Sequence, residues 1–226
     1  MFPLNTILLD EARPILEKAT QLVWLIGGAG SGKTTVSRAL AARLGRPVYD
    51  MDEAVFGRFA FDPIRHPATT AWFTAPDPLA FLLGLPWPEF DAFYRTTNAE
   101  MLDLLAAELR DRPDTPLLVD GGISHPSVLV RAVPAARVVY LEGPPGHGTQ
   151  QWESAESRAA MKAAIQALPD GEAMWSRFLE YDRRMTATMG RESRAAGIVT
   201  VSWDEATDVE GLSCRVAELP LFIRSS

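Results

Sequence analysis

Gly-Gly-Ala-Gly-Ser-Gly-Lys-Thr, at residues 27–34, is a complete G-x-x-x-x-G-K-[ST] motif. Residues 22–26 before it form a short apolar run typical of a buried strand. Residues 35–44 after it have helix-like spacing of apolar side chains and stop at Gly45. Strand, glycine loop and helix in this order form the context in which the motif binds phosphate, because backbone N–H groups and the helix N-terminus face the anion. The stretch therefore predicts a loop that binds a nucleoside triphosphate.

The predicted nucleotide site comprises this loop and the first residues of the helix. We expect Lys33 to reach the outer phosphates of ATP and the Thr34 hydroxyl to ligate Mg²⁺. A glycine-rich turn that binds nothing is the alternative, and the flanking strand and helix argue against it. The residues expected to contact ATP are Gly28, Ala29, Gly30, Ser31, Gly32, Lys33, Thr34 and Thr35.

The composition excludes several classes of function. The chain has 226 residues, 47% of them hydrophobic, which is enough to bury the core of a single domain spanning residues 1–226. A net charge of −7 argues against a nucleic-acid partner, and no apolar run approaches the ~20 residues of a membrane span. Cys214 is the one cysteine, and the N-terminus lacks the basic segment of a signal peptide, so we expect a cytoplasmic protein. The sequence does not predict its oligomeric state.

Strand-like and helix-like segments alternate along the chain. Strands are expected at 22–26, 47–51, 117–120, 138–142 and 198–203. Helices are expected at 7–19 (interrupted or started at Pro14), 35–44, 88–110, 127–133, 153–189 (broken at 169–171) and 208–218. Short apolar strands joined by helices predict a three-layer α/β fold, a parallel sheet covered by helices on both faces. Ligands of such sheets bind beyond the carboxyl ends of the strands, so functional residues should follow each strand.

Two acids, Asp50 and Asp52, follow the second expected strand. Alternation along a strand would turn both side chains to one face, near the phosphate loop. A phosphoryl transferase needs a group that orients the attacking hydroxyl, a role we expect for Asp52, with Asp50 beside Mg²⁺ or the substrate. The alternative is that these acids only cap the helix expected at residue 53, because Asp is a favoured N-cap.

The third expected strand ends in Asp120, Gly121 and Gly122. An acid that ends an apolar strand one crossover after a phosphate loop indicates a ligand of Mg²⁺, here Asp120. The two glycines would let the backbone come close to a substrate. The glycine- and proline-rich segment 143–150, after the fourth strand, lacks a lysine, and its prolines remove backbone donors. It is therefore predicted to lead into a lid, with His147 a solvated loop residue, and not to form a second nucleotide site.

A substrate-binding insert is expected at about 56–95, and a lid is expected at about 143–185. The insert is rich in aromatic residues, for which ordinary packing is the favoured interpretation and an apolar acceptor pocket the alternative. Arg58 is expected to bind an anionic group of the acceptor, and Arg65 and Arg95 are further candidates for that role.

The lid should bring an arginine over the transferring phosphoryl group. Arg177 and Arg184 lie seven residues apart, so they share one face of the expected helix. We prefer these two slightly over Arg158. Met174, Trp175, Phe178, Met185 and Met189 form an apolar stripe on this helix that is typical of core packing.

Together these motifs resemble the branch of phosphate-loop kinases that contains nucleoside-monophosphate kinases and shikimate kinases. In shikimate kinases the first acid of the D-x-D lies near Mg²⁺, the second holds the substrate hydroxyl, and a glycine run follows the third strand. The resemblance implies those roles for Asp50, Asp52 and the pair Gly121-Gly122, and it implies a five-stranded sheet in the order 2-3-1-4-5. Residues 50–67 are similar, more loosely, to zeta-toxin and chloramphenicol-phosphotransferase kinases, in which a single acid after the second strand is the base. That comparison also selects Asp52.

The motifs and the resemblance predict an ATP- and Mg²⁺-dependent kinase that phosphorylates a hydroxyl of a small molecule. A nucleotide or nucleoside kinase is one alternative. An NTP-hydrolysing switch that controls a partner is an alternative from another class. Asp52 and the aromatic insert favour the small-molecule kinase, and the sequence does not identify the acceptor.

Overall fold

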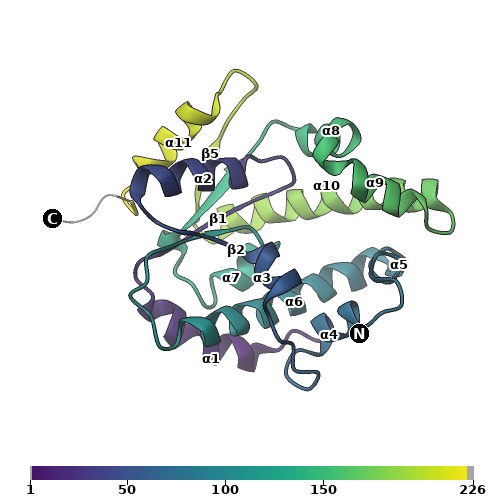
Figure 1. Ribbon diagram of the computed structural model, residues 1–226, viewed down its shortest axis with the longest axis horizontal. Coiled ribbons are helices and arrows are strands. Elements are labelled where there is room, and N and C mark those ends of the chain that lie inside the picture. The colour runs from purple at the N-terminus through teal and green to yellow at the C-terminus, as the bar shows by residue number, and fades with distance from the viewer. Residues whose placement is uncertain (1, 223–226) are drawn as a thin grey trace.

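The computed structural model describes residues 2–222, which form a parallel five-stranded sheet with helices around it (Figure 1). Its strands are β1 (Leu22–Gly27), β2 (Val48–Asp50), β3 (Leu117–Asp120), β4 (Val138–Glu142) and β5 (Val199–Ser202). They lie in the order β2-β3-β1-β4-β5, and all pairs are parallel. The predicted fold and strand order are confirmed. All residues of β1 and β3 are buried, as expected for central strands covered on both faces.

The helices agree with the predicted ones in most places. They are α1 (Thr6–Lys18), α2 (Lys33–Leu44), α3 (Met51–Gly57), α4 (Pro67–Phe73), α5 (Pro78–Gly84), α6 (Trp87–Leu109), α7 (Pro126–Leu129), α8 (His147–Ser154), α9 (Ala159–Gln166), α10 (Gly171–Ala195) and α11 (Val209–Ala217), with the 3-10 turns η1 (Ala135–Arg137) and η2 (Glu156–Arg158). The break predicted at 169–171 is confirmed, because α10 begins at Gly171.

Three predicted helix boundaries were wrong. Pro14 neither interrupts nor starts α1; it lies on the exposed side of the helix, where the carbonyl that loses its hydrogen bond can be hydrated. The expected helix over 127–133 ends at Leu129. The expected first part of the 153–189 helix is divided into α8, η2 and α9, since the chain turns away between them to form the lid.

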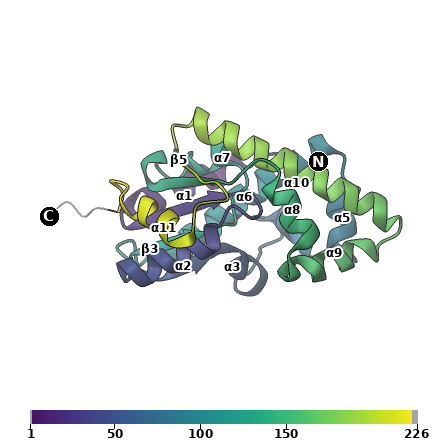
Figure 2. The same cartoon turned by 90° about the horizontal axis from the view of Figure 1, so that it is seen from above.

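Helices cover both faces of the sheet (Figures 1 and 2). On one face, α2 and α11 pack over Val23 and Leu25 of β1. On the other, α1, α6 and α7 pack over Trp24 and Ile26, together with the C-terminal part of α10. Side chains of β1 thus alternate between two separate cores, and this fixes the phosphate loop at the strand's carboxyl end.

The insert and the lid lie at the end of the sheet where the phosphate loop opens (Figure 1). Helices α4 and α5 pack against the start of α6 and against α10 through a cluster of aromatic side chains: Trp72, Phe81, Trp87, Phe90, Phe93, Tyr94 and Tyr181. This cluster supports ordinary packing for most aromatics of the insert. In the lid, Ile165 of α9 and Trp175 of α10 are buried together with Leu83 of α5. Trp175 and Met189 of the predicted apolar stripe are buried, so that stripe does belong to the core.

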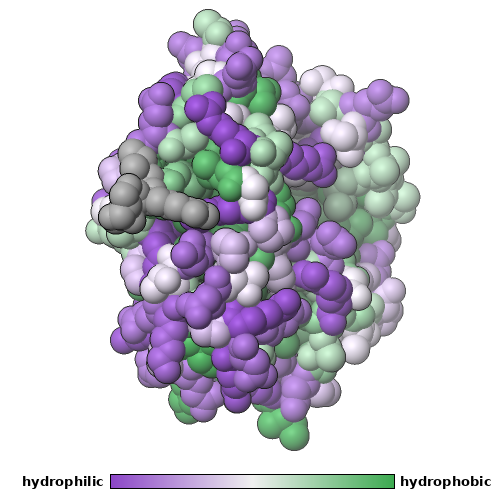
Figure 3. Space-filling view, turned by 60° about the vertical axis from the view of Figure 1, so that its left-hand side comes forward, coloured by the Kyte–Doolittle hydropathy of each residue, from purple (hydrophilic) through white to green (hydrophobic). Residues whose placement is uncertain are grey.

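The helices of residues 2–222 bear on whether the chain could cross a membrane. Within residues 2–222, no helix has both the length and the apolar character needed to cross a membrane. On the face shown in Figure 3, hydrophilic side chains predominate and hydrophobic ones lie in small scattered groups.

Candidate active site

The phosphate loop joins β1 to α2 as predicted. Gly32 is the N-cap of α2 with φ 83°, in the left-handed region that favours glycine, so the loop can turn sharply into the helix. Because α2 begins at Lys33, its first N–H groups and its partial positive charge are directed toward the loop. The loop is also held from the edge strand: Trp203, after β5, donates its indole N–H to the Ser31 carbonyl at 2.9 Å.

The side chains of Lys33 and Asp52 both approach the place beside Gly121 that a side chain would fill. A Cβ placed on Gly121 would lie 3.3 Å from Cε of Lys33 and 3.7 Å from Oδ2 of Asp52, and φ of Gly121 is 69°. The buried indole N–H of Trp24 donates to the Gly121 carbonyl at 2.9 Å and fixes this stretch of backbone. The structure therefore brings together the lysine, the acid and the glycine that the sequence analysis selected.

Asp50 and Asp52 belong to two different elements, whereas the prediction had strand alternation place both on one face. Strand β2 ends at Asp50, and Asp52 lies in the first turn of α3, so strand alternation does not align them. Asp50 caps α3, its Oδ1 accepting from the Glu53 N–H at 3.0 Å, as the capping alternative predicts. Asp50 still lies at the site, because the β2–β3 register pairs it with Asp120.

The surroundings of Asp52 raise the pKa of its carboxyl group. The carboxylate is open to solvent but lies among protein atoms that displace much of its hydration, and this desolvation raises its pKa. Lys33 lowers the pKa, Asp50 raises it and Arg158 lowers it, in decreasing order of effect. A carboxylate with a raised pKa is a stronger proton acceptor, as a base beside an attacking hydroxyl requires.

Asp120 and Thr34 form the part of the site suited to a metal ion. Asp120 is buried, and its Oδ1 has no hydrogen-bond partner. Desolvation raises the pKa of Asp120, and a hydrogen bond with Thr34 lowers it. An orphaned carboxylate oxygen beside a hydroxyl fits Mg²⁺, which prefers oxygen ligands and keeps several from water and phosphate. Within residues 2–222, no three His, Cys, Asp or Glu side chains gather to hold a metal unaided, so phosphate oxygens would complete the shell.

Arg177 and Arg184, the lid arginines preferred from the sequence, do not lie over the phosphate loop in the structure. Arg177 donates to the Leu83 carbonyl at 2.6 Å, and Arg184 pairs with Glu180 at 2.5 Å and lies over the ring of Trp87. Both line a separate hollow of about 400 Å³ between α5 and α10. They do share one face of α10, but that face packs against the insert and not over the phosphate loop.

Arg158 is the lid arginine that the structure brings to the acids. It ends η2, and its guanidinium lies 3.9 Å from the centre of the Trp152 ring, stacked over it. Desolvation lowers the pKa of Arg158, while the charges of Asp182 and Asp52 raise it. Its charge therefore acts on the same carboxylate that faces Lys33.

Two residues of this cluster were missed by the sequence analysis. Asp182 of α10 has Oδ2 3.5 Å from where a Cβ on Gly148 would lie, and burial raises its pKa against the effects of Trp152, Arg158 and Lys33. Burial raises the pKa of Tyr94, on α6, to about 12, with further contributions from Asp52 and Asp182. Neither residue stands in a motif: each lies inside a long helix, and only the fold brings it to the site.

The residues predicted to bind the acceptor are only partly brought to this place. Gly121 is there, but a Cβ on Gly122 would meet the side chain of Met51, so Gly122 serves the close packing of α3 on the loop. Arg58 lies over the ring of Tyr49, 4.7 Å from its centre, at the edge strand β2. The predicted role of Arg58 at the acceptor is not supported by this position.

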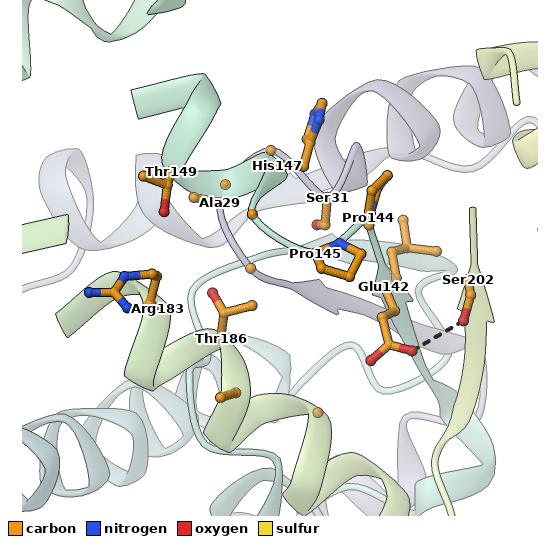
Figure 4. A pocket seen from close by; sticks show the side chains of 18 of the residues that line it. Ala29, Ser31, Glu142, Pro144, Pro145, His147, Thr149, Arg183, Thr186 and Ser202 are labelled. Atoms are coloured by element: carbon orange, nitrogen blue, oxygen red, sulfur yellow. Dashed lines mark hydrogen bonds between the residues drawn. The ribbon is translucent and has the colours of Figure 1, made fainter. Parts of the chain in front are cut away.

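A cavity of about 550 Å³ lies beside the phosphate loop, between the segment after β4 and helix α10 (Figure 4). Ala29 and Ser31 line it from the loop, and Arg183 and Thr186 line it from α10. His147, predicted to be a solvated loop residue, instead begins α8, where it is partly buried and contacts the edge of Trp203 at 5.0 Å between ring centres. The cavity is of the size that holds a small ligand.

Comparisons with known proteins agree with this geometry. A family model for shikimate kinase matches residues 29–65, which include most of the phosphate loop and Asp52. A shikimate kinase of Chromobacterium violaceum is 47% identical over 45 residues, which are 20% of this chain and 24% of that protein. The structure of shikimate kinase from Acinetobacter baumannii in complex with shikimate is similar with a TM-score of 0.51 and 20% identity, over 88% of this chain and 92% of that one.

The sequence likeness is local and the structural likeness is extensive. The matched segment spans about a quarter of the curated relative. The structural likeness is to the Acinetobacter baumannii protein, with which this chain shares fold over most of its length but only 20% sequence identity. The predicted resemblance to the shikimate-kinase branch is confirmed: the chain has the phosphate-loop α/β fold of the shikimate kinases and is similar to them in sequence over the phosphate loop and the acid that follows β2.

Proposed function

We propose that this protein is an ATP- and Mg²⁺-dependent kinase that phosphorylates a hydroxyl group of a small molecule. The observation that carries the proposal is that Lys33 and Asp52 both border the same open space beside the Cα of Gly121. A phosphate-binding lysine and a carboxylate that border the same space can hold a phosphoryl donor and an alcohol next to one another. The fold and the local sequence likeness to shikimate kinases support the same class of reaction.

The proposed roles fall into two groups: some residues bind the nucleotide, and others bind and activate the acceptor. The loop N–H groups and Lys33 bind the β- and γ-phosphates, and Thr34 and Asp120 would hold Mg²⁺. When bound, the metal ion supplies positive charge to the phosphate oxygens. Arg158, presented by the lid, adds positive charge where the phosphoryl group moves.

On the acceptor side, Asp52 accepts a hydrogen bond from the hydroxyl and takes its proton. The hydroxyl oxygen forms a bond to the γ-phosphorus as the bond to the bridging β–γ oxygen breaks, which yields the phosphate ester and ADP. Most of the rate in this chemistry comes from positioning and charge stabilisation. The bare backbone at Gly121 lets the acceptor lie against the chain between the two side chains.

The test is ADP release with and without candidate acceptors. A kinase accelerates strongly only with a suitable alcohol and forms its phosphate ester, whereas an NTP-hydrolysing switch releases ADP and inorganic phosphate at a rate that no alcohol changes. Lys33→Ala should fold normally, because its side chain serves phosphate, and should lose at least ~10²-fold in turnover. Normal turnover in folded Lys33→Ala would rule out the nucleotide site.

A further inference from the structure

An acidic acceptor would need a cation, but each arginine within residues 56–95, all of which the structure describes, already has a partner. Arg58 lies over the ring of Tyr49. Arg65 pairs with Asp103 at 2.6 Å and with Glu11, and Arg95 pairs with Asp91 at 2.8 Å and with Glu192 at 2.7 Å. The pairs of Arg65 and Arg95 tie the insert to α1, α6 and α10. Freeing either arginine for a ligand would leave a partly buried carboxylate without its partner, which is costly.

Two cations, Lys33 and Arg158, lie near the acids of the acceptor position in the protein without nucleotide. Lys33 and Arg158 are the cations that act on Asp52, and the same two act on Asp182. Phosphates of bound ATP would engage both cations. Asp52 and Asp182 would then face the acceptor uncompensated, with the hydroxyl of Tyr94 near both. An acidic group placed there would lose its hydration and meet only like charge.

An apolar surface adjoins Asp52 on the same helix. Phe56 follows Asp52 by four residues on α3, so both side chains lie on one face of the helix. The Phe56 side chain is 63% exposed, and its ring meets the edge of Trp72 at 5.7 Å between centres. A large exposed aromatic next to the proposed base is suited to an apolar part of a ligand.

From this arrangement we infer that the acceptor is a non-acidic alcohol, neutral or cationic, with an apolar or aromatic portion beside the hydroxyl. Hydroxy acids such as shikimate, and nucleoside monophosphates, are therefore poor acceptors for this chain. The inference rests on the proposed kinase function and concerns only the acceptor. It separates this chain from the relative solved with shikimate, whose fold it shares.

The test uses shikimate and its methyl ester, which have the same hydroxyls and differ in the carboxylate charge. Binding of each to the protein saturated with a non-hydrolysable ATP analogue and Mg²⁺ is measured by calorimetry, for the wild type and for the Asp52→Asn/Asp182→Asn double variant. Removing the two like charges should raise the affinity for shikimate relative to that for the ester by at least ~10-fold, about 1.4 kcal/mol, because the lost Asp52 hydrogen bond affects both ligands alike and cancels in the ratio. Asp10→Asn, at an exposed acid of α1, is the matched control and should change neither.

Two results overturn the inference. One is an unchanged ratio of shikimate to ester affinity in the double variant. The other is phosphorylation of shikimate by the wild type as fast as that of any non-acidic alcohol in a panel of acid and ester pairs. Failure of the kinase proposal looks different. In that case the wild type would not bind ADP, or would form no phosphate ester with any alcohol. Normal ADP binding together with strong shikimate binding refutes only the charge argument.

Discussion

Asp52 lies beside the phosphate loop, is exposed, and forms no hydrogen bond within residues 2–222. Asp50 uses an oxygen to cap α3, and Asp120 is buried beside Thr34. Asp52 borders the same space beside Gly121 as Lys33 and is an exposed residue. The sequence could select Asp52 because an acid after the second strand is a local feature. It could not reveal that Asp50 and Asp52 belong to different elements, since Tyr49-Asp50-Met51-Asp52 is compatible with both a strand end and a helix start.

Asp52→Asn should bind ATP with near-normal affinity and lose ~10²–10⁴-fold in phosphoryl transfer, the usual span for a lost general base. Because burial raises the pKa of Asp52, wild-type transfer should fall as the pH drops through that raised pKa, at a higher pH than for an ordinary Asp. Calorimetry of ATP binding beside acceptor phosphorylation measures both effects. Asp50→Asn is the comparison and should be milder in transfer; an inactive Asp50→Asn with an active Asp52→Asn would reverse the two roles.

Arg158→Ala should lower turnover by ~10²–10³-fold while ATP still binds, because a cation over the moving phosphoryl group acts mainly in the transition state. Arg177→Ala is the matched control: this arginine contacts Leu83 in the insert, and its loss should change turnover little. Single-turnover rates of the two variants decide between them. Equal losses, or a larger loss for Arg177→Ala, would restore the assignment made from sequence.

Among the helices and strands, the elements that are continuous apolar runs were predicted accurately from the sequence. The strands β1, β3 and β4 are continuous apolar runs because helices cover both faces of the sheet, and their bounds agree with the predicted ones to within a residue. The lid was less predictable. Helices α8 and α9 are short, eight residues each, and their breaks depend on packing against α10 and the phosphate loop and not on local preference.

Among these helices, α4 gives a test, because it is capped from another helix. The buried Glu100 of α6 accepts from the N–H groups of Ala68 and Thr69 at 3.0 and 2.7 Å and from the Thr69 hydroxyl at 2.6 Å. Glu100→Ala leaves these donors without a partner and should lower the free energy of unfolding by at least about 2 kcal/mol. Denaturant unfolding measures it, with exposed Glu89→Ala on the same helix as the control. A Glu100→Ala protein as stable as the wild type would show that α4 is held by its aromatic contacts alone.

In the whole molecule, the candidate site is assembled from segments far apart in the chain. Tyr94 comes from α6, Arg158 and Trp152 from the lid, and Asp182 from α10, and they meet the motif residues only after the sheet has formed. Motifs predicted the nucleotide side because the phosphate loop is contiguous. The acceptor side is not contiguous, so no spacing along the sequence could report it, and the arginines that composition suggested there are used to join elements.

Gathering carboxylates in one site should lower the stability of the folded molecule, and Asp52 allows this to be measured. Its pKa is raised above the ordinary value of 3.8, so the charged form is disfavoured by folding. The folded state then binds a proton more readily than the unfolded state, and the penalty is fully present at pH 7 and disappears as the pH falls through the raised pKa to below the unfolded value. Asp52→Asn should therefore raise Tm at neutral pH while transfer is lost, and the gain should vanish in acid.

Asp204→Asn supplies a control of opposite sign. The side chain of Asp204 accepts from the Thr207 hydroxyl at 2.7 Å and from the Ala206 N–H at 3.2 Å, and these bonds hold its pKa below the usual range. Its charged form is favoured by folding, so Asp204→Asn should leave Tm unchanged or lower it at pH 7. Thermal unfolding of both variants between pH 7 and pH 3 provides the comparison. A Tm of Asp52→Asn equal to or below the wild type at pH 7 would mean that Lys33 and Arg158 offset the desolvation of the Asp52 charge in the free protein, and that folding does not disfavour the charged form.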